Sequence, residues 1–169
     1  MNQETKKISD LTTAGLIAAL YVLLTFLANL FGLASGAVQL RLSEALTILP
    51  VFTWAAVPGL FVGCILANFL TGCALWDVVF GSLATLAGAL GTYYIGRKYP
   101  ATAPVFPIAA NCAVVPFVLQ YVYGSTDSYW FLAATVGAGE ILSCAFLGGI
   151  LYKVLKKRNL FHNTLRQEK

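Results

Sequence analysis

Charged residues are scarce in this sequence. They occupy 11% of its 169 positions, whereas about one quarter is typical of a soluble domain. Because a soluble domain needs a charged surface to face water, the deficit excludes that class and predicts a chain surrounded by lipid. Four long stretches, 11–40, 45–76, 78–96 and 99–126, contain no ionisable acid or base. Each reaches or exceeds the roughly 18 apolar residues that indicate a membrane-spanning helix.

Motifs of catalysis and cofactor binding are also missing. The chain has one histidine, His162, and no Gly-x-x-x-x-Gly-Lys phosphate-binding loop. These absences argue against ATP hydrolysis by that route, His-rich metal sites and serine-histidine chemistry. We therefore expect no enzyme activity, no bound cofactor and no metal. Lysine and arginine form short clusters that do not interleave with aromatic residues, so nucleic acid is not an expected partner.

The four cysteines show no metal-binding pattern. Cys64, Cys73, Cys112 and Cys144 lie in apolar stretches, without C-x-x-C spacing and without a nearby histidine. We expect buried small hydrophobic side chains in place of metal ligands or disulfides.

The stretch 45–76 decides the number of helices. As a single helix it would reach about 48 Å, too long for a hydrocarbon core of about 30 Å. Pro58-Gly59 offers a break, and two helices here put ten of the eleven Lys and Arg residues on one side of the membrane, as the positive-inside rule requires. We therefore predict an all-α integral membrane protein with both termini cytoplasmic. Its single domain, 1–158, would contain six helices at about 11–33, 43–57, 59–73, 77–97, 104–123 and 128–153, followed by a cytoplasmic tail, 159–169.

Local signals suggest where some helices begin and bend. Ser9-Asp10 and Ser43 are N-cap candidates for the first and second helices. Glu44 would follow Ser43 in the first turn, where a negative charge suits the helix dipole. Pro116 should kink the fifth helix.

Glu140 is the most informative residue for function. It lies about twelve residues into the last helix, roughly 18 Å from its outer end. A carboxylate at that depth is costly unless it is protonated, partnered or hydrated, so it marks a functional interior. Asn111 has a matching depth on the fifth helix, and Asn68 and Gln120 add amides nearer the outer ends. For each residue, the alternative is a hydrogen bond between helices that only stabilises the bundle.

A second group of candidate binding residues falls at the predicted outer surface. Arg41, Glu44 and Asp77 occur at helix ends there, and Arg41 is the one base that breaks the positive-inside pattern. Trp76 and Trp130 fall at the same level. They fit an aromatic belt at the membrane interface, and either could instead stack on a planar ligand.

The first helix carries small residues at repeated positions. Ala14 and Ala18, and likewise Gly15 and Ala19, are four residues apart and share a helix face. Such pairs let another helix approach closely, although the spacing is common in apolar sequence.

The block from Val38 to Leu90 has a distinctive order of residues. It reads VQLRLSEALTILP over 38–50, PGL over 58–60, GC at 63–64, AN at 67–68 and DVVFGSLATL over 77–86. This block resembles the QueT family, whose members are described as substrate-binding S components of energy-coupling-factor (ECF) transporters for queuosine precursors. The resemblance implies a non-enzymatic subunit of a bacterial plasma membrane that captures a deazaguanine, such as queuine or its aminomethyl precursor, on the outer face.

The resemblance also implies partners. A transmembrane scaffold subunit and two ATPase subunits would drive uptake. Ala14 and Ala18 look like the Ala-x-x-x-Ala motif by which S components dock on that scaffold.

The ligand implied by the resemblance gives each candidate residue a role. Glu140 would accept the two N–H groups of the guanine-like edge, and Glu44 or Asp77 would hold the cationic amine. Arg41 would orient the outer loop. The remaining candidates would donate hydrogen bonds or cover the ring: Asn68, Asn111 and Gln120 for the first role, Trp76 or Trp130 for the second.

Three alternatives stay open at this stage. One is an S component for another small vitamin or nucleobase. The second is a self-sufficient secondary carrier that needs no ATPase, and the third is a structural membrane subunit in which Glu140 merely joins helices.

Overall fold

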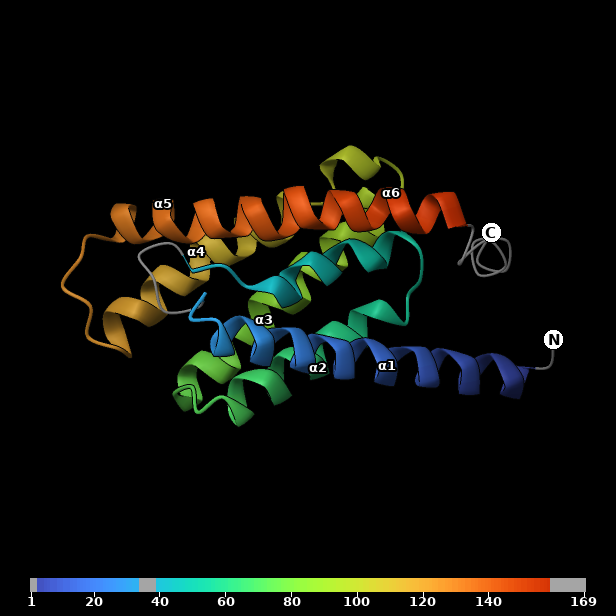
Figure 1. Ribbon diagram of the computed structural model, residues 1–169, viewed down its shortest axis with the longest axis horizontal. Helices are drawn as coiled ribbons and strands as arrows, with labels where there is room; N and C mark the ends of the chain where they lie inside the picture. Colours follow the sequence, from blue (N-terminus) through green and yellow to red (C-terminus); the bar gives the residue numbers. More distant parts are fainter. Residues whose placement is uncertain (1–2, 34–38, 159–169) are drawn as a thin grey trace.

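The computed structural model describes residues 3–33 and 39–158, which are helical over most of their length and contain no strand. This confirms the predicted all-α membrane bundle; Val38 and the tail 159–169 lie outside the described residues. The elements are α1 (Gln3–Leu30), the 3-10 helix η1 (Leu42–Val51), α2 (Ala56–Leu70), α3 (Leu75–Gly91), its π-helical extension η2 (Thr92–Gly96), the short 3-10 turn η3 (Pro100–Thr102), α4 (Val105–Tyr121), α5 (Tyr129–Glu140), the π-helical segment η4 (Ile141–Leu147) and α6 (Gly148–Arg158). The last three follow one another without a break and form one long helix (Figure 1).

Four helical stretches of the described chain are long and apolar enough to cross a membrane. They are Gln3–Leu30, Leu75–Gly96, Pro100–Tyr121 and Tyr129–Arg158. The other two expected helices, η1 and α2, are shorter. Figure 1 shows η1 and α2 running in opposite directions along the long axis of the molecule, so the stretch 45–76 does contain two helices.

The break between these two helices falls earlier than predicted. We placed it at Pro58-Gly59, but η1 ends at Val51 and α2 begins at Ala56. Pro58 lies in the first turn of α2, where a missing N–H needs no partner within the helix. The proline therefore starts the second helix and does not separate the two.

The predicted start of the first helix is also wrong. We expected it near residue 11 with Ser9-Asp10 as its cap, but α1 already begins at Gln3. Thr12 and Thr13 lie inside the helix, and their hydroxyl groups donate to carbonyl oxygens four residues earlier, each at 2.8 Å. Threonine can satisfy its hydroxyl in this way and continue a helix.

Ser43 does not cap the second helix. η1 begins one residue earlier, and Arg41 in the cap position makes no side-chain capping bond. The Ser43 hydroxyl instead accepts a hydrogen bond from Thr25 of α1, with 2.9 Å between the two oxygens. Because a buried hydroxyl needs a partner, Ser43 ties η1 to α1. Pro116, which we expected to kink the fifth helix, lies buried inside α4, and that helix continues through it to Tyr121.

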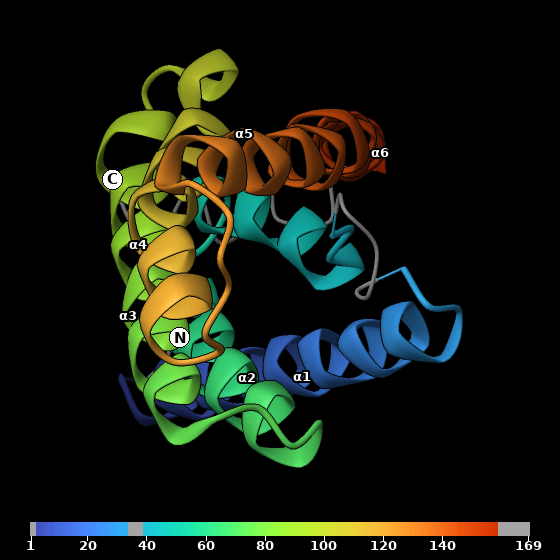
Figure 2. The ribbon, with the colours of Figure 1, turned by 90° about the vertical axis from the view of Figure 1, so that its left-hand side faces the viewer.

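η1 lies in the middle of the bundle. Figure 2 shows it with α1 and α2 on one side, α5 and α6 on the other, and α3 and α4 closing a third side. Its contacts agree, since η1 packs against α1, α2, α3, η2, η4 and α6. All residues from Ser43 to Val51 are buried, which makes η1 the axis around which the longer helices pack.

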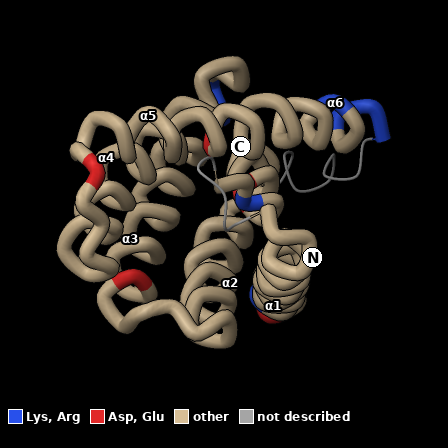
Figure 3. Tube along the Cα trace, turned by 60° about the vertical axis from the view of Figure 1, so that its left-hand side comes forward, with Lys and Arg blue, Asp and Glu red and all other residues tan. Residues whose placement is uncertain are grey.

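The two ends of the molecule differ. The start of α1 and the end of α6 lie at one end, and the connections from α2 to α3 and from α4 to α5 lie at the opposite end, called the loop end below (Figure 1). Figure 3 shows blue Lys and Arg segments at the end of α6 and in the turn after α3, with few charges along the helices between. This arrangement agrees with the predicted clustering of basic residues at the end that carries both termini.

α1 and α2 pack unusually closely. A Cβ atom added to Gly59 would come within 2.7 Å of the Ala14 carbonyl oxygen, and one added to Gly63 within 3.0 Å of the Ala18 Cα. Two small residues four positions apart on α2 therefore face two on α1. Such pairing brings helix backbones together and allows dense contacts in a membrane.

Candidate functional site

A polar cavity of about 590 Å³ occupies the loop end of the bundle. Its walls come from α1, α2, α3, α4 and the segment before η1. The lining residues are Thr25, Asn29, Gln39, Arg41, Asn68, Thr71, Cys73, Asp77, Val115, Val118, Leu119 and Tyr123. Three predicted site residues, Arg41, Asn68 and Asp77, thus lie around one cavity, although they come from three different parts of the chain.

Asp77 is held in place by a tyrosine that the sequence analysis did not single out. The buried Asp77 lies in the first turn of α3, where the helix dipole favours a carboxylate. Tyr123, in the connection after α4, donates its hydroxyl to the Asp77 Oδ2 at 2.8 Å and accepts the Ala74 N–H at 3.1 Å. These bonds join the two connections at the loop end.

The tyrosine remains a donor under ordinary conditions. Burial and the neighbouring Asp77 carboxylate raise the pKa of Tyr123 to about 12, although the Ala74 N–H acts in the opposite direction. The hydroxyl therefore keeps its proton well above neutral pH, and its bond to Asp77 persists.

Arg41 is a basic residue in the lining of this cavity. Its side chain is half-buried. Burial lowers the pKa of Arg41, but facing groups that include Tyr21, Asp77 and Glu44 outweigh that effect and raise the pKa overall. The guanidinium is therefore charged, and it lies within Coulombic range of acids in the cavity wall and in the bundle centre.

Glu44 lies at the centre of the bundle, fully buried in the first turn of η1. Its Oε1 accepts a hydrogen bond from the Tyr21 hydroxyl of α1. Its other carboxylate oxygen, Oε2, is buried and has no hydrogen-bond partner among the described residues. Since almost all buried polar atoms are paired, this oxygen is a strong candidate for a ligand contact.

Glu140 and Asn111 meet, as their matching depths predicted. The Asn111 Nδ2 donates to the Glu140 Oε1 at 2.9 Å, and both residues are buried. The Cys144 thiol donates to the other oxygen, Oε2, at 3.1 Å. Both oxygens of Glu140 therefore have protein partners. η4 begins directly after Glu140, and such π-helical segments often occur at functional sites.

The two carboxylates and one thiol form a compact buried cluster. One ligating atom from each of Glu44, Glu140 and Cys144 lies within 4.8 Å of the others. This arrangement corrects our view of the cysteines as simple hydrophobes. All four are free, but the buried Cys144 belongs to the acidic cluster, and Cys64 accepts hydrogen bonds from Asn68 at 3.5 Å and Thr85 at 3.4 Å.

Three other predicted residues lie away from the cavity and the cluster. Gln120 donates to the Asp127 carbonyl oxygen at 2.7 Å, which ties the end of α4 to the following loop. Trp76 stacks on Phe80 at 5.8 Å and is 59% exposed, and Trp130 is 80% exposed. Neither tryptophan lines the polar cavity, so this conformation does not support their predicted stacking on a ligand. Their exposure fits the aromatic belt that the sequence analysis gave as their first interpretation.

The structure places Ala14 and Ala18 against α2. They face Gly59 and Gly63, as described above, and Ala18 is buried. The second small pair of the same helix faces outward, because Gly15 has open space around its Cβ position and Ala19 is exposed. The docking role predicted for Ala14 and Ala18 is therefore not supported by their position, since the pair already serves packing within the chain.

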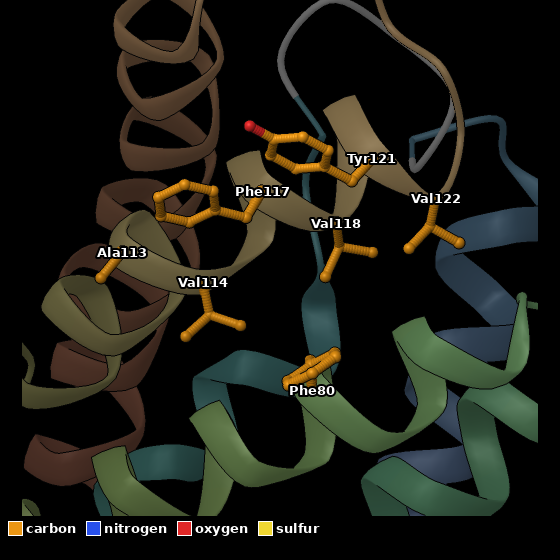
Figure 4. Close-up of a pocket in the computed structure, with 7 residues that line it drawn as sticks. All are labelled: Phe80, Ala113, Val114, Phe117, Val118, Tyr121 and Val122. Carbon is orange, nitrogen blue, oxygen red and sulfur yellow. The ribbon is translucent and has the colours of Figure 1, made fainter.

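A separate apolar hollow of about 430 Å³ lies between α3 and α4 (Figure 4). Phe80 of α3 faces side chains of α4 across it, among them Phe117 and Val118. No charged residue lines this hollow, so it suits the hydrocarbon tails of lipids. Val118 also lines the polar cavity, and the two spaces therefore share part of a wall.

Sequence reasoning missed several polar residues around the cavity and the buried cluster. Thr25, Tyr21 and Tyr123 bond to Ser43, Glu44 and Asp77, respectively. Each is separated from its partner by at least 18 residues, so only the folded chain brings them together. The spacing of Tyr21 and Thr25 on one face of α1 was the available signal.

A bundle with several membrane-spanning helices and a ligand-sized polar cavity at one end has the architecture of a membrane transport protein. The chain belongs to the QueT transporter family, because the model of that family matches residues 11–157. A relative from Lactococcus lactis subsp. cremoris (strain MG1363), named queuosine precursor transporter QueT, is 28% identical over 163 residues, which cover 90% of this chain and 95% of the relative. No solved structure matches the chain significantly.

Proposed function

We propose that this chain is the substrate-binding subunit of an ECF-type importer and captures a queuosine precursor from the outside of a bacterial plasma membrane. The polar cavity at the loop end carries the proposal. Its volume of about 590 Å³ lies within the range of roughly 300–1,000 Å³ that is usual for small-molecule sites. The name of the relative from Lactococcus lactis supports the choice of substrate.

The chemistry of the cavity suits a deazaguanine. Arg41 and Asn68 can donate hydrogen bonds to a ring oxygen, and Asp77 can accept N–H groups of the base. Tyr123 supplies an aromatic surface in the same wall, the role that we first gave to Trp76 or Trp130. A flat base rich in donors and acceptors matches this set of side chains.

Other proteins would supply the energy for uptake. The chain carries no phosphate-binding loop, so ATP hydrolysis would fall to two ATPase subunits and be transmitted by a transmembrane scaffold. The scaffold would bind α1 on its outward face, where Gly15 and Ala19 leave room for close approach. This replaces Ala14 and Ala18 as the expected contact.

Binding by the purified chain is the first test. Isothermal titration of the detergent-solubilised protein with aminomethyl-deazaguanine should show saturable binding, and Asp77→Asn should weaken it. Asp127→Asn removes the same charge from an exposed loop residue and should leave affinity unchanged. Absence of binding to deazaguanines, together with binding of another base or vitamin, would assign a different substrate.

Uptake by cells tests the coupling. Cells that produce the chain with its scaffold and ATPases should accumulate the labelled base, and cells that produce the chain alone should not. Equal accumulation in both would contradict the ECF mechanism and favour a self-sufficient carrier.

A further inference from the structure

Acids outnumber bases around the site. Asp77 lines the cavity, and Glu44 and Glu140 belong to the buried cluster. Glu44 directly follows Ser43, which is bonded to Thr25 of the cavity wall. Arg41 is the one base among these residues, and it lies within Coulombic range of both Asp77 and Glu44. Carboxylates that are buried without an equal number of cations are costly. A positively charged ligand would reduce this excess of acids.

The three acids differ in which of their carboxylate oxygens already have hydrogen-bond partners. Asp77 already accepts a hydrogen bond from Tyr123, and both oxygens of Glu140 have partners in Asn111 and Cys144. Glu44 has one oxygen engaged by Tyr21 and one, Oε2, without a partner among the described residues. The free acceptor at the centre of the site is therefore on Glu44.

We infer that the buried carboxylates of Glu44 and Glu140 form a subsite for a protonated amine, in which Glu44 makes the direct contact, and that this subsite selects cationic ligands over uncharged isosteres. The inference rests on the proposed function and adds to it the charge of the substrate and the residue that recognises this charge. It also assigns the amine to Glu44, whereas sequence alone left Glu44 and Asp77 as alternatives.

Glu140 acts in this subsite as a positioning residue. Asn111 and Cys144 hold its carboxyl group close to Glu44, so a cation bound at Glu44 would lie beside a second acid. Cys144 links the two acids further, since its thiol also lies 3.5 Å from the Glu44 carbonyl oxygen. The subsite therefore belongs to both η1 and the helix that passes through η4.

Two matched ligands test the inference. One is aminomethyl-deazaguanine, and the other carries a hydroxymethyl group in the same position, so that size is kept and the charge is lost. A hydrogen bond between charged groups is worth enough for a preference of about tenfold or more. We expect the wild-type protein to bind the amine at least about tenfold more tightly than the alcohol in titration calorimetry.

Glu44→Gln keeps the shape of the side chain and removes its charge. It should bind the alcohol and show a preference for the amine reduced to within about threefold. Asp127→Asn, the exposed charge control, should keep the full preference. Asp77→Asn should weaken both ligands equally and keep their ratio. Wild-type protein without a preference, or a Glu44→Gln variant that retains it, would overturn the inference.

The remaining outcomes are also decisive. If Asp77→Asn alone loses the preference, the amine lies at Asp77 and the inference is wrong. If Glu44→Gln does not fold, the test is the ratio of the amine and alcohol affinities in Asp77→Asn. A preference for the amine that is retained in this variant supports Glu44. Wild-type protein that binds neither ligand would contradict the proposed function itself, an outcome distinct from equal binding of the two.

Discussion

The Tyr21 hydroxyl of α1 donates a hydrogen bond to the Glu44 carboxylate of η1. Both side chains are almost fully buried, with exposed fractions of 2% and 0%. Thr25, one turn further along α1, makes the corresponding bond to Ser43. α1 is thus attached through these side chains to η1 at the centre of the bundle.

Removing the Tyr21 hydroxyl should destabilise the protein. In Tyr21→Phe, the Glu44 carboxylate loses the hydrogen bond from the Tyr21 hydroxyl and stays buried, at a cost of about 1–3 kcal/mol. Thermal unfolding in detergent should show a lower melting temperature. Tyr94→Phe is the control, because Tyr94 is 68% exposed, and its melting temperature should match the wild type. Equal stability of Tyr21→Phe would contradict the importance of this bond.

Gly63 should be intolerant of even a methyl group. In Gly63→Ala, the new Cβ would lie 2.8 Å from the Tyr21 Cβ and 3.0 Å from the Ala18 Cα, so α1 and α2 would have to separate. We expect a loss of about 1–3 kcal/mol, as is usual for overpacking. Gly15→Ala has open space and should be neutral or slightly stabilising because alanine favours the helix. A stable Gly63→Ala protein would show that the two helices are not in such close contact.

The outward face of α1 should govern assembly with the scaffold. Gly15→Leu and Ala19→Leu should reduce co-purification of the scaffold several-fold, because the added side chains block close approach, while ligand binding stays unchanged. Ala18→Leu should lower stability and ligand binding, because Ala18 faces Gly63. The opposite pattern, with a stable Ala18→Leu protein that has lost only the scaffold, would restore the docking role predicted from the sequence.

The bond between Tyr123 and Asp77 should be insensitive to pH near neutrality. Because the pKa of Tyr123 is raised to about 12, any stability that the bond contributes is present below the ordinary tyrosine pKa of about 10 and is lost only as pH rises through about 12. Tyr123→Phe should therefore lower the melting temperature by the same amount at about pH 6 and pH 9. A difference that vanishes at the higher pH would contradict a protonated Tyr123.

The broad architecture followed from the position of charge in the sequence. Long stretches without ionisable residues predicted the helices, and the clusters of basic residues predicted that both termini lie at one end. Local features were less reliable. Pro58 suggested a break and instead begins a helix, because the first turn of a helix tolerates proline. Ser43 suggested a cap and instead bonds to α1, since burial gives a hydroxyl partners that its neighbours in sequence do not reveal.

The candidate site was only partly predictable for the same reason. Depth along a helix increases by a fixed rise per residue and could be counted, which brought Glu140 and Asn111 together correctly. Which acid keeps a free oxygen depends on contacts with Tyr21 and Cys144, and these arise from packing between distant helices. For the tryptophans the sequence left both an aromatic belt and stacking on a ligand open, and their exposure fits the membrane interface.

The close contact between α1 and α2 has a mechanical consequence. The two helices are in close contact at Gly59 and Gly63, and α1 is also bonded to η1 through Tyr21 and Thr25. Movement of α1 along α2 would therefore break these contacts. A partner that binds the outward face of α1 would be attached to a helix that lines the polar cavity. A movement of α1 that such a partner imposes would be passed directly to α2 and η1.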